Sequence, residues 1–362
     1  MMNKLNIAYT CNVRKPDMED PRYGEFESPS TIAAITAALE RAGANVELID
    51  VGPDIYHQLE KRKNNIDLVF NNTEGLDEQE LREAIVPFFC EHLHIPNSGS
   101  SPKTFINKMD KATAKRIVAY DGVPTAKFQL MLPGDRLGNL SFPLMVKPYS
   151  EGTSIGINQN SKVHSVTALN KALDAIYQEF SQPALVEEFL PGLEYTIGII
   201  GNHVLPILEF DFAKIPGQPQ VRDPHVKNIE NPYVTRLAWD DKAIHFAELA
   251  ITAHESLEVR DYNRMDFRER DGQLYFLEAN VIPGLHPTEA DLTNMCRHAG
   301  IPHNDMVALI VDAAIQRLRK RFPGRFDGKT EVLEELSAAA FAKAAKKGVM
   351  THQDRVYNLL GN

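Results

Sequence analysis

The sequence predicts a mixed α/β protein, in part α+β, with packed domains built around a parallel and an antiparallel sheet. Three observations predict this class. Strand-like apolar runs alternate with helical periodicity over the first hundred residues, a hairpin signal joins two alternating runs near residue 270, and 43% of the 362 residues are hydrophobic, enough for a sizeable core. We expect an N-terminal α/β domain with a parallel sheet, a small central α+β domain, a C-terminal α+β domain with an antiparallel sheet and a helical tail, at residues 1–100, 101–189, 190–323 and 324–362.

The N-terminal domain is predicted from alternating strands and helices. In its first helix, Ile32, Ile35 and Leu39 recur at helical spacing, and Gly43 is placed to end the helix. The polar segment 10–29 is expected to be a long loop after the first strand, where open α/β sheets commonly contact ligands. The expected strands are 5–9, 45–49 and 66–70, and the expected helices are 30–42 and 78–92.

The other domains are predicted from the same periodicities. The central domain is expected to hold strands 144–148 and 184–189, helices 110–121 and 166–180, and a loop of small residues at 150–156. The C-terminal domain is expected to hold strands 195–200, 204–210, 263–269 and 273–280, helices 240–256 and 304–321, and a tail helix around 338–347.

Composition excludes several classes of protein. The 39 basic and 49 acidic residues give a net charge of −10, which argues against non-specific binding of nucleic acid. Cys11, Cys90 and Cys296 are far apart, so neither a disulfide framework nor a zinc site is expected. No apolar run reaches the length of a membrane span, and the first nine residues lack the features of a signal peptide. We expect a cytoplasmic protein whose partners are small molecules, neither nucleic acid nor membrane.

The strongest local signal is the stretch 263–280, where oxygen-bearing side chains and an arginine recur two residues apart on two strands. Carboxylate and amide oxygens suit Mg²⁺, so a metal site is one interpretation of this pattern. A solvent-facing polar face of an edge hairpin is the other. The side chains concerned are Arg264, Asp266, Glu278 and Asn280.

The register of this hairpin decides whether its two acids can meet. A regular two-residue turn at Asp271-Gly272 would pair Asp266 with Leu277 and put Glu278 on the opposite face. We therefore predict a three-residue loop, 270–272, with Gly272 at positive φ, or an equivalent one-residue shift.

Two further segments have the chemistry to bind a nucleotide. Lys147 ends an apolar strand before the small-residue loop 150–156, whose backbone N–H groups could hold a phosphate. Glu187, in the strand 184–189, could accept a hydrogen bond from an amine, and Glu194 could accept from ribose hydroxyls. Each segment alone is also consistent with an ordinary turn or with acidic surface residues.

The order of these segments is more specific than any one of them. It resembles the ATP-grasp superfamily and, within it, the D-alanine–D-alanine ligase family, over roughly residues 5 to 320. The similarity is strongest at Lys108-Met-Asp-Lys111, at 146–156, at 185–190 and at Phe276-Leu-Glu-Ala-Asn-Val-Ile-Pro-Gly284.

The resemblance implies an ATP-grasp fold and an ATP-dependent, ADP-forming carboxylate–amine ligase that works through an acyl phosphate. It implies two Mg²⁺ ions, which Mn²⁺ could replace, amino-acid substrates, and it allows a homodimer. The residues that match nucleotide contacts are Lys111, Lys147, Glu151, Gly152, Thr153, Glu187, Glu188, Leu190, Glu194 and Lys227. The matches to metal ligands are Asp266, Glu278 and Asn280, and those to catalytic groups are Arg264, Gly284 and Ser154.

Departures from the family concern the amino-acid substrates. Glu289 falls where the family has a serine that holds the acceptor's carboxylate, so a glutamate there is expected to repel D-alanine. His286 or Arg297 is the alternative carboxylate contact, and Glu25 and Glu27 are nearest to the family's glutamate for the first amino acid. We expect a ligase joining amino acids or small peptides other than two D-alanines. The alternatives are a true D-alanine–D-alanine ligase and a non-catalytic ATP-binding protein.

Overall fold

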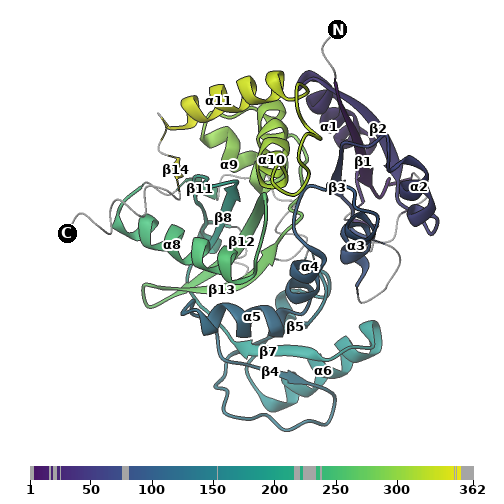
Figure 1. Cartoon of the computed structure of the whole chain (residues 1–362). Coiled ribbons are helices and arrows are strands. Elements are labelled where there is room, and N and C mark those ends of the chain that lie inside the picture. The colour runs from purple at the N-terminus through teal and green to yellow at the C-terminus, as the bar shows by residue number, and fades with distance from the viewer. Residues whose placement is uncertain are drawn as a thin grey trace.

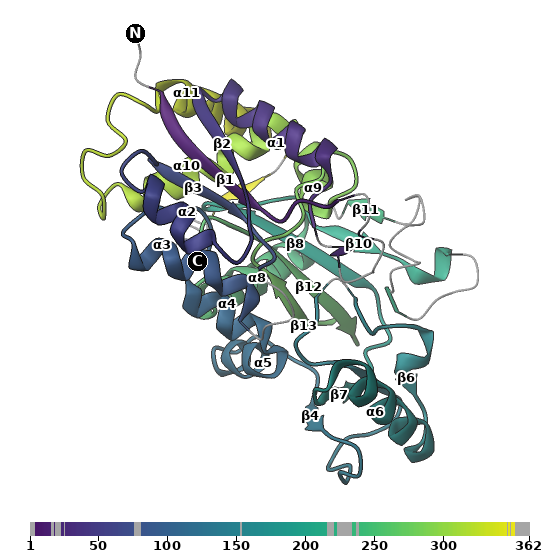
Figure 2. The ribbon, with the colours of Figure 1, turned by 90° about the vertical axis from the view of Figure 1, so that its right-hand side faces the viewer.

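The computed structural model describes residues 4–15, 18, 23–24, 26–75, 81–152, 154–215, 221–222, 234–236, 239–345, 347 and 349–351. Within these residues the chain forms three sheets, one parallel and two antiparallel, each covered by helices (Figures 1 and 2). The predicted α/β and α+β class is confirmed, whereas the predicted domain bounds stay a prediction. No helix of the described part is long and apolar enough to cross a membrane.

The N-terminal sheet is parallel, with strand order β2-β1-β3. Its elements are β1 (Leu5–Cys11), α1 (Pro29–Arg41), β2 (Ala44–Asp50), α2 (Ile55–Arg62), β3 (Leu68–Asn72) and α3 (Ile85–His92). Because side chains alternate along β1, Ile7 and Tyr9 pack toward α1, while Ala8 packs toward α2 and α3. The sequence prediction missed α2. Of the predicted helix 78–92, residues 78–80 lie outside the described residues, and the rest is a short 3₁₀ turn, Arg82–Ala84, followed by α3.

The central part is a pair of helices followed by a four-stranded antiparallel sheet of order β4-β7-β5-β6. Its elements are α4 (Pro102–Met109), α5 (Lys111–Tyr120), β4 (Phe128–Met131), β5 (Leu144–Pro148), β6 (Lys162–Val163), α6 (Val166–Phe180) and β7 (Ala184–Glu188). Leu169, Leu173 and Ile176, at helical spacing on α6, are buried in one cluster with Leu144 and Val146 of β5. This sheet lies at the bottom of the molecule in Figure 1.

The C-terminal sheet has the order β11-β10-β8-β12-β13, with β9 pairing β8 and β14 pairing β9. Its strands are β8 (Glu194–Ile200), β9 (His203–Val204), β10 (Leu208–Phe210), β11 (Val234–Arg236), β12 (Tyr262–Arg270), β13 (Gln273–Asn280) and β14 (Met350–Thr351). The single strand predicted at 204–210 is wrong. Pro206 has no N–H to donate to a ladder, and the run divides into β9 and β10.

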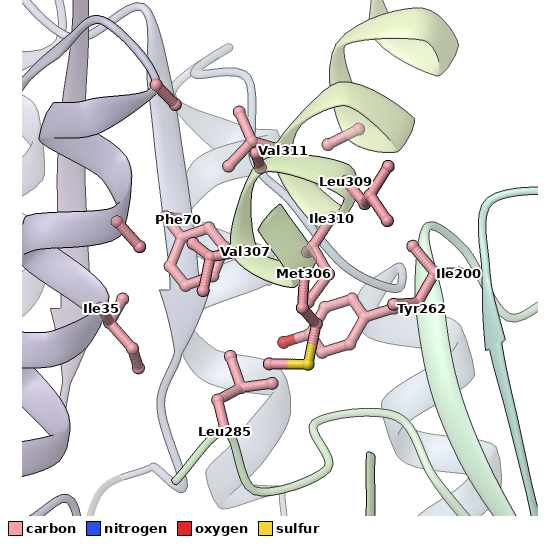
Figure 3. Close-up of a cluster of buried hydrophobic side chains, with 14 of the residues drawn as sticks. Ile35, Phe70, Ile200, Tyr262, Leu285, Met306, Val307, Leu309, Ile310 and Val311 are labelled. Atoms are coloured by element: carbon pink, nitrogen blue, oxygen red, sulfur yellow. The ribbon is translucent and has the colours of Figure 1, made fainter. Parts of the chain in front are cut away.

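Helices cover both faces of this sheet. They are α8 (Asp241–Ser256), α9 (Asp291–His298), α10 (His303–Leu318) and the tail helix α11 (Glu331–Ala345). Phe246 of α8 packs on Tyr195 of β8, while α9 and α10 contact β8 at the other side, where α10 also packs against α1 and α11. Figure 3 shows the core at this other side, in which Phe70 of β3 lies beside Val307 and Tyr262 of β12 lies beside Met306, both of α10. The N-terminal and C-terminal sheets are therefore joined by one continuous apolar core.

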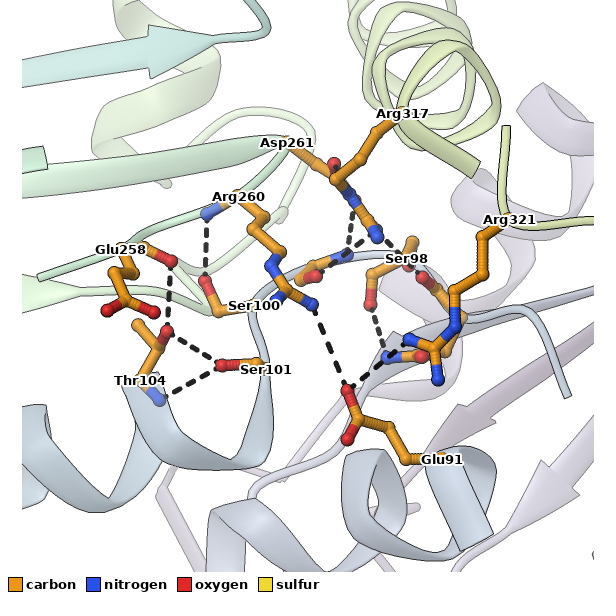
Figure 4. Close-up of polar contacts among 12 residues, drawn as sticks. Glu91, Ser98, Ser100, Ser101, Thr104, Glu258, Arg260, Asp261, Arg317 and Arg321 are labelled. Carbon is orange, nitrogen blue, oxygen red and sulfur yellow. Dashed lines mark hydrogen bonds and ion pairs between the residues drawn. The ribbon is translucent and has the colours of Figure 1, made fainter. Parts of the chain in front are cut away.

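A polar joint also connects these two parts (Figure 4). Arg317 of α10 donates to both oxygens of Asp261, at 2.7 Å each, and to the backbone carbonyl of Asn97. Asp261 in turn accepts from the backbone N–H of Gly99 at 2.7 Å. Glu91 of α3 lies within 4 Å of the guanidinium of Arg321. These contacts fix the N-terminal sheet relative to the C-terminal one.

Candidate nucleotide and metal site

A cavity lies between the central sheet and the C-terminal sheet and, counted with its open mouth, measures about 700 Å³. It is lined by Met145, Lys147, Ser154, Ile157, Glu187, Glu188, Phe189, Leu190, Glu194, Val221, Arg222, Asp266, Arg268, Leu277 and Glu278. Candidate residues from three separate sequence segments thus meet around one space, at the carboxyl ends of β5 and β7 and on the β12–β13 hairpin.

Two lysines approach the cavity from the central part. Lys147 lies on β5 and Lys111 is the first residue of α5, and both are buried. Lys111 Nζ lies 3.5 Å from Glu278 Oε2 and donates to the backbone carbonyl of Glu151. Burial lowers the pKa of Lys111 more than Glu278 raises it. Lys147 therefore lines the cavity itself, and Lys111 contacts Glu278, which also lines it.

Glu187 is tied to lysines on both of its oxygens. Oε1 lies 2.6 Å from Lys147 Nζ and Oε2 lies 2.9 Å from Lys115 Nζ. Burial acts to raise the pKa of Glu187, but Lys115 and Lys147 lower it to about 2. Sequence reasoning missed Lys115, which lies one helical turn after Lys111; the i, i+4 spacing was the available signal.

The remaining nucleotide candidates surround the ends of β7 and β8. Leu190 and Glu194 are buried beside the cavity, and Glu188 lies 3.3 Å from Arg270. Arg268, absent from the sequence prediction, lies 4.9 Å from the ring centroids of both Phe189 and Phe212. It also donates to the carbonyl of Gly192, so it is held rigidly next to Glu194.

The loop after β5 is partly described. Ser154 adopts positive φ (63°) and donates its hydroxyl to the carbonyl of Arg222 at 2.9 Å. Glu151 accepts from Gln182 at 2.7 Å, and Gly152 accepts from the N–H of Ile155. Two candidates, Thr153 and Lys227, lie outside the described residues.

The β12–β13 hairpin brings the predicted metal ligands together. Asp266 pairs directly with Glu278, and Arg264 with Asn280. The predicted three-residue loop is wrong: Arg270 pairs with Gln273 across a two-residue turn. Asp271 and Gly272 both have positive φ (55° and 79°), as a type I′ turn requires. The one-residue shift occurs instead at Leu277, where a β-bulge turns Glu278 to the face of Asp266.

The donor set of this hairpin fits Mg²⁺. Asp266 Oδ1 accepts from Thr196 at 2.7 Å, and Oδ2 accepts from Asn280 Nδ2 at 3.2 Å and lies 3.0 Å from Arg264. Burial raises the pKa of Asp266, Arg264 lowers it, and the nearby charge of Glu278 raises it again. A divalent cation would relieve the repulsion between the buried Asp266 and the partly exposed Glu278. Among the described residues, no three His, Cys, Asp or Glu side chains lie close enough together to hold a metal ion. The third ligand beside Asp266 and Glu278 would therefore be the amide oxygen of Asn280.

Arg264 has a second carboxylate partner that the sequence did not reveal. Its Nη1 donates to Asp291 Oδ2 at 2.8 Å, and Arg222 donates to both oxygens of the same side chain. Gly284, the candidate oxyanion donor, is exposed in the coil between β13 and α9. Arg222 lies in a loop and Asp291 is the first residue of α9, and the sequence analysis assigned a role to neither.

The described residues predicted to contact the amino-acid substrates do not line the cavity. The Glu289 side chain is 81% exposed, and the expectation that its charge faces the acceptor stays a prediction. His286 Nδ1 accepts from the Glu289 N–H and lies 3.9 Å from Glu289 Oε2. Arg297 donates to the carbonyls of Pro287 and Thr288.

Of the two N-terminal glutamates, only one is described. Glu25 lies outside the described residues. Glu27 accepts from Asn72 at 2.7 Å, and burial raises the pKa of its carboxyl. Glu27 thus lies near the carboxyl end of the N-terminal sheet, where burial favours the neutral form of its carboxyl.

Known proteins are similar to this chain in both sequence and fold. The family described as D-ala D-ala ligase C-terminus matches residues 118–312, more than half of the chain. A D-alanine–D-alanine ligase of Syntrophotalea carbinolica is 31% identical over 296 residues, which are 78% of this chain and 90% of the relative. The structure of a D-alanine–D-alanine ligase from Bacillus anthracis, complexed with ATP, superposes with a TM-score of 0.65 at 19% identity, over 88% of this chain and all of that one. VanG D-Ala:D-Ser ligase from Enterococcus faecalis has a TM-score of 0.65 at 18% identity, over 86% of this chain and all of that one. The chain belongs to the D-alanine–D-alanine ligase family and has the ATP-grasp fold.

Proposed function

We propose that the protein is an ATP-dependent, ADP-forming ligase that joins the carboxylate of one amino acid to the amine of another. The observation that carries this proposal is the cavity lined by Lys147 and by the paired acids Asp266 and Glu278, with Lys111 3.5 Å from Glu278. Lysines suit the phosphates of ATP, and paired acids suit the Mg²⁺ that accompanies it. A non-catalytic nucleotide binder would have no need to retain Arg264 as well.

The chemistry explains why these groups are needed. A carboxylate is a poor acyl donor, so its oxygen takes the terminal phosphoryl group of ATP, and ADP leaves. An amine then attacks the acyl carbon and phosphate leaves with the bonding electrons. Phosphoryl transfer depends mainly on positioning and on positive charge around the transferred group. Mg²⁺, held by Asp266, Glu278 and Asn280, would supply part of that charge.

We assign roles to the protein's own groups on this basis. Lys111 and Lys147 bind phosphate oxygens, Arg264 stabilises the acyl phosphate, and the backbone N–H of Gly284 binds the developing oxyanion. Leu190 and Glu194 contact adenine and ribose. Glu187 serves chiefly as the anchor of Lys147, since both of its oxygens face lysines.

For the acceptor we propose an amino acid or small peptide other than D-alanine. The supporting observation is Asp291, a buried carboxylate 2.8 Å from Arg264. Its charge repels a second carboxylate about 4 Å away by about 4 kcal/mol at an effective dielectric constant of 20, so the acceptor has to hold any carboxylate of its own away from Arg264. The alternative is a true D-alanine–D-alanine ligase.

One experiment tests both parts. ADP release is measured with ATP, Mg²⁺ and amino acids offered singly and in pairs, and products are identified by mass spectrometry. We expect ADP release that depends on an amino acid and on Lys147, with a dipeptide product other than D-alanyl-D-alanine. Efficient use of D-alanine alone would establish the alternative, and the absence of ADP release with every amino acid would refute the ligase.

A further inference from the structure

Arg222 lines the cavity, but none of the roles above uses it. Its guanidinium forms a two-pronged ion pair with Asp291: Nη1 lies 3.0 Å from Oδ2 and Nη2 lies 3.1 Å from Oδ1. Arg264 Nη1 donates to the same Oδ2 at 2.8 Å. One carboxylate therefore holds two guanidiniums that come from distant segments of the chain.

The three side chains are largely removed from water. The exposed fractions are 13% for Arg222, 15% for Arg264 and 9% for Asp291. Burial acts to lower the pKa of each arginine, but Asp291 and, for Arg264, also Asp266 raise it overall, so both guanidiniums stay charged. With little solvent screening, the Asp291 charge is what lets the two cations lie together.

The position of Arg222 is fixed from two other directions. Its Cζ lies 3.9 Å from the ring centroid of Phe210, so the guanidinium plane rests on an aromatic face. Its carbonyl accepts from Ser154 at 2.9 Å, and the carbonyl of Val221 accepts from Gln159 at 3.2 Å. The dipeptide 221–222 thus connects the loop after β5 with the N-terminus of α9.

We propose that Arg222 is a positioning residue that acts on Arg264 through Asp291. The inference rests on the proposed function, in which Arg264 faces the acyl phosphate. Asp291 is oriented by the fork of Arg222, and Arg264 is directed by its two contacts with Asp266 and Asp291. The hydroxyl of Ser154 ties this arrangement to the loop that borders the phosphate site. Arg264 is therefore aligned only when the loop after β5 is in its place. The acyl phosphate then forms between that loop and the aligned Arg264.

Loss of Arg222 should change the chemistry more than the binding of ATP. A misplacement of about 1 Å at a catalytic group can reduce a rate about 10²-fold. We expect Arg222→Ala to lower kcat by about that factor, to leave the KM for ATP almost unchanged, and to release more ADP per dipeptide formed, because a poorly held acyl phosphate is lost to water. Arg222→Lys should restore part of kcat, since an ammonium keeps one contact with Asp291 but not the fork.

The test measures kcat, the KM for ATP and the ratio of dipeptide to ADP for both variants, with binding of ATP and thermal unfolding measured alongside. Arg62→Ala is the matched control, because Arg62 also pairs with a carboxylate, Glu47 at 2.7 Å, but on the N-terminal sheet. We expect Arg62→Ala to keep wild-type kinetics.

The outcomes separate the two proposals. A kcat of Arg222→Ala within twofold of wild type, or a fall in ATP affinity that parallels the fall in kcat, would overturn the positioning role. If Arg222→Ala fails to fold, Arg222→Lys decides on the same criteria, and failure of both to fold would make Arg222 a structural residue only. A wild-type protein that releases no ADP with any amino acid would instead refute the proposed function.

Discussion

Glu187→Gln is the substitution whose effect on stability follows most directly from the structure. The change keeps the size of the side chain and removes its charge. Glu187 is 3% exposed and lies between Lys115, which is fully buried, and Lys147. Glutamine would leave two buried ammonium groups facing a neutral amide.

Two routes give the magnitude of the loss. Removing one partner of a buried ion pair typically costs about 3–5 kcal/mol. The pKa of Glu187 falls from 4.5 to about 2 on folding, which corresponds to about 3 kcal/mol at about 1.4 kcal/mol per unit. We therefore expect Glu187→Gln to lower the free energy of unfolding at pH 7 by about 3 kcal/mol.

The pH dependence gives a second, independent readout. Because the folded-state pKa is depressed, this contribution is fully present above pH 4.5 and is lost as the pH falls toward 2. The difference between wild type and Glu187→Gln in urea unfolding should therefore shrink over that window. Glu188→Gln is the control. Glu188 lies 3.3 Å from Arg270, whose side chain is partly exposed, so loss of this ion pair should cost under about 1 kcal/mol. A cost below about 1 kcal/mol for Glu187→Gln, or a difference that does not vary with pH, would contradict the reasoning.

Three further substitutions test other parts of the structure. Lys147→Ala should reduce amino-acid-dependent ADP release at least about 10²-fold, and near wild-type turnover would remove Lys147 from the phosphate site. Gly192→Ala would place a Cβ 2.4 Å from the backbone oxygen of Glu269, so it should lower the free energy of unfolding by about 1–3 kcal/mol in urea titration; an unchanged midpoint would mean that the strand end shifts freely. Arg317→Met leaves the Asp261 side chain, which is 1% exposed, without its ion pair. It should lower the free energy of unfolding by about 3–5 kcal/mol in the same titration, and a much smaller loss would mean that the polar joint between the sheets contributes little to stability.

Where a segment has an uninterrupted period, the sequence predicted its element closely. The strand 144–148, the helix 166–180 and the strand 273–280 were predicted with the bounds that the structure has. Short elements were missed for a physical reason. The helix α2 has eight residues, of which Ile55 and Leu59 are the buried ones, and two apolar positions are too few to define a period. The helix α9 likewise follows an irregular loop, with Ala290 as an N-cap that makes no side-chain bond.

The residues of the candidate site also differ in how far the sequence could reveal them. Lys147, Asp266 and Glu278 lie on strands and could be named from the sequence, because each stands in an apolar or alternating run of strand length. The bulge at Leu277 could be required by argument but not located, since any residue of either strand could have supplied the shift. Asp291 could not be found at all, because its importance comes only from contacts with side chains 27 and 69 residues away.

The two candidate phosphate lysines, which the family pattern treats alike, differ in the folded protein. Burial acts to lower the pKa of Lys147, yet Glu187, 2.6 Å away, raises it overall, so this ammonium is charged and firmly held. Burial lowers the pKa of Lys111, whose nearest carboxylate, Glu278, is 3.5 Å away and is also a proposed metal ligand. If Glu278 turns to a cation, Lys111 loses its countercharge and an anion becomes its best replacement partner. Lys147 keeps Glu187 whether or not an anion is present. The arrangement therefore provides one lysine whose charge Glu187 favours and one whose charge a bound anion would stabilise.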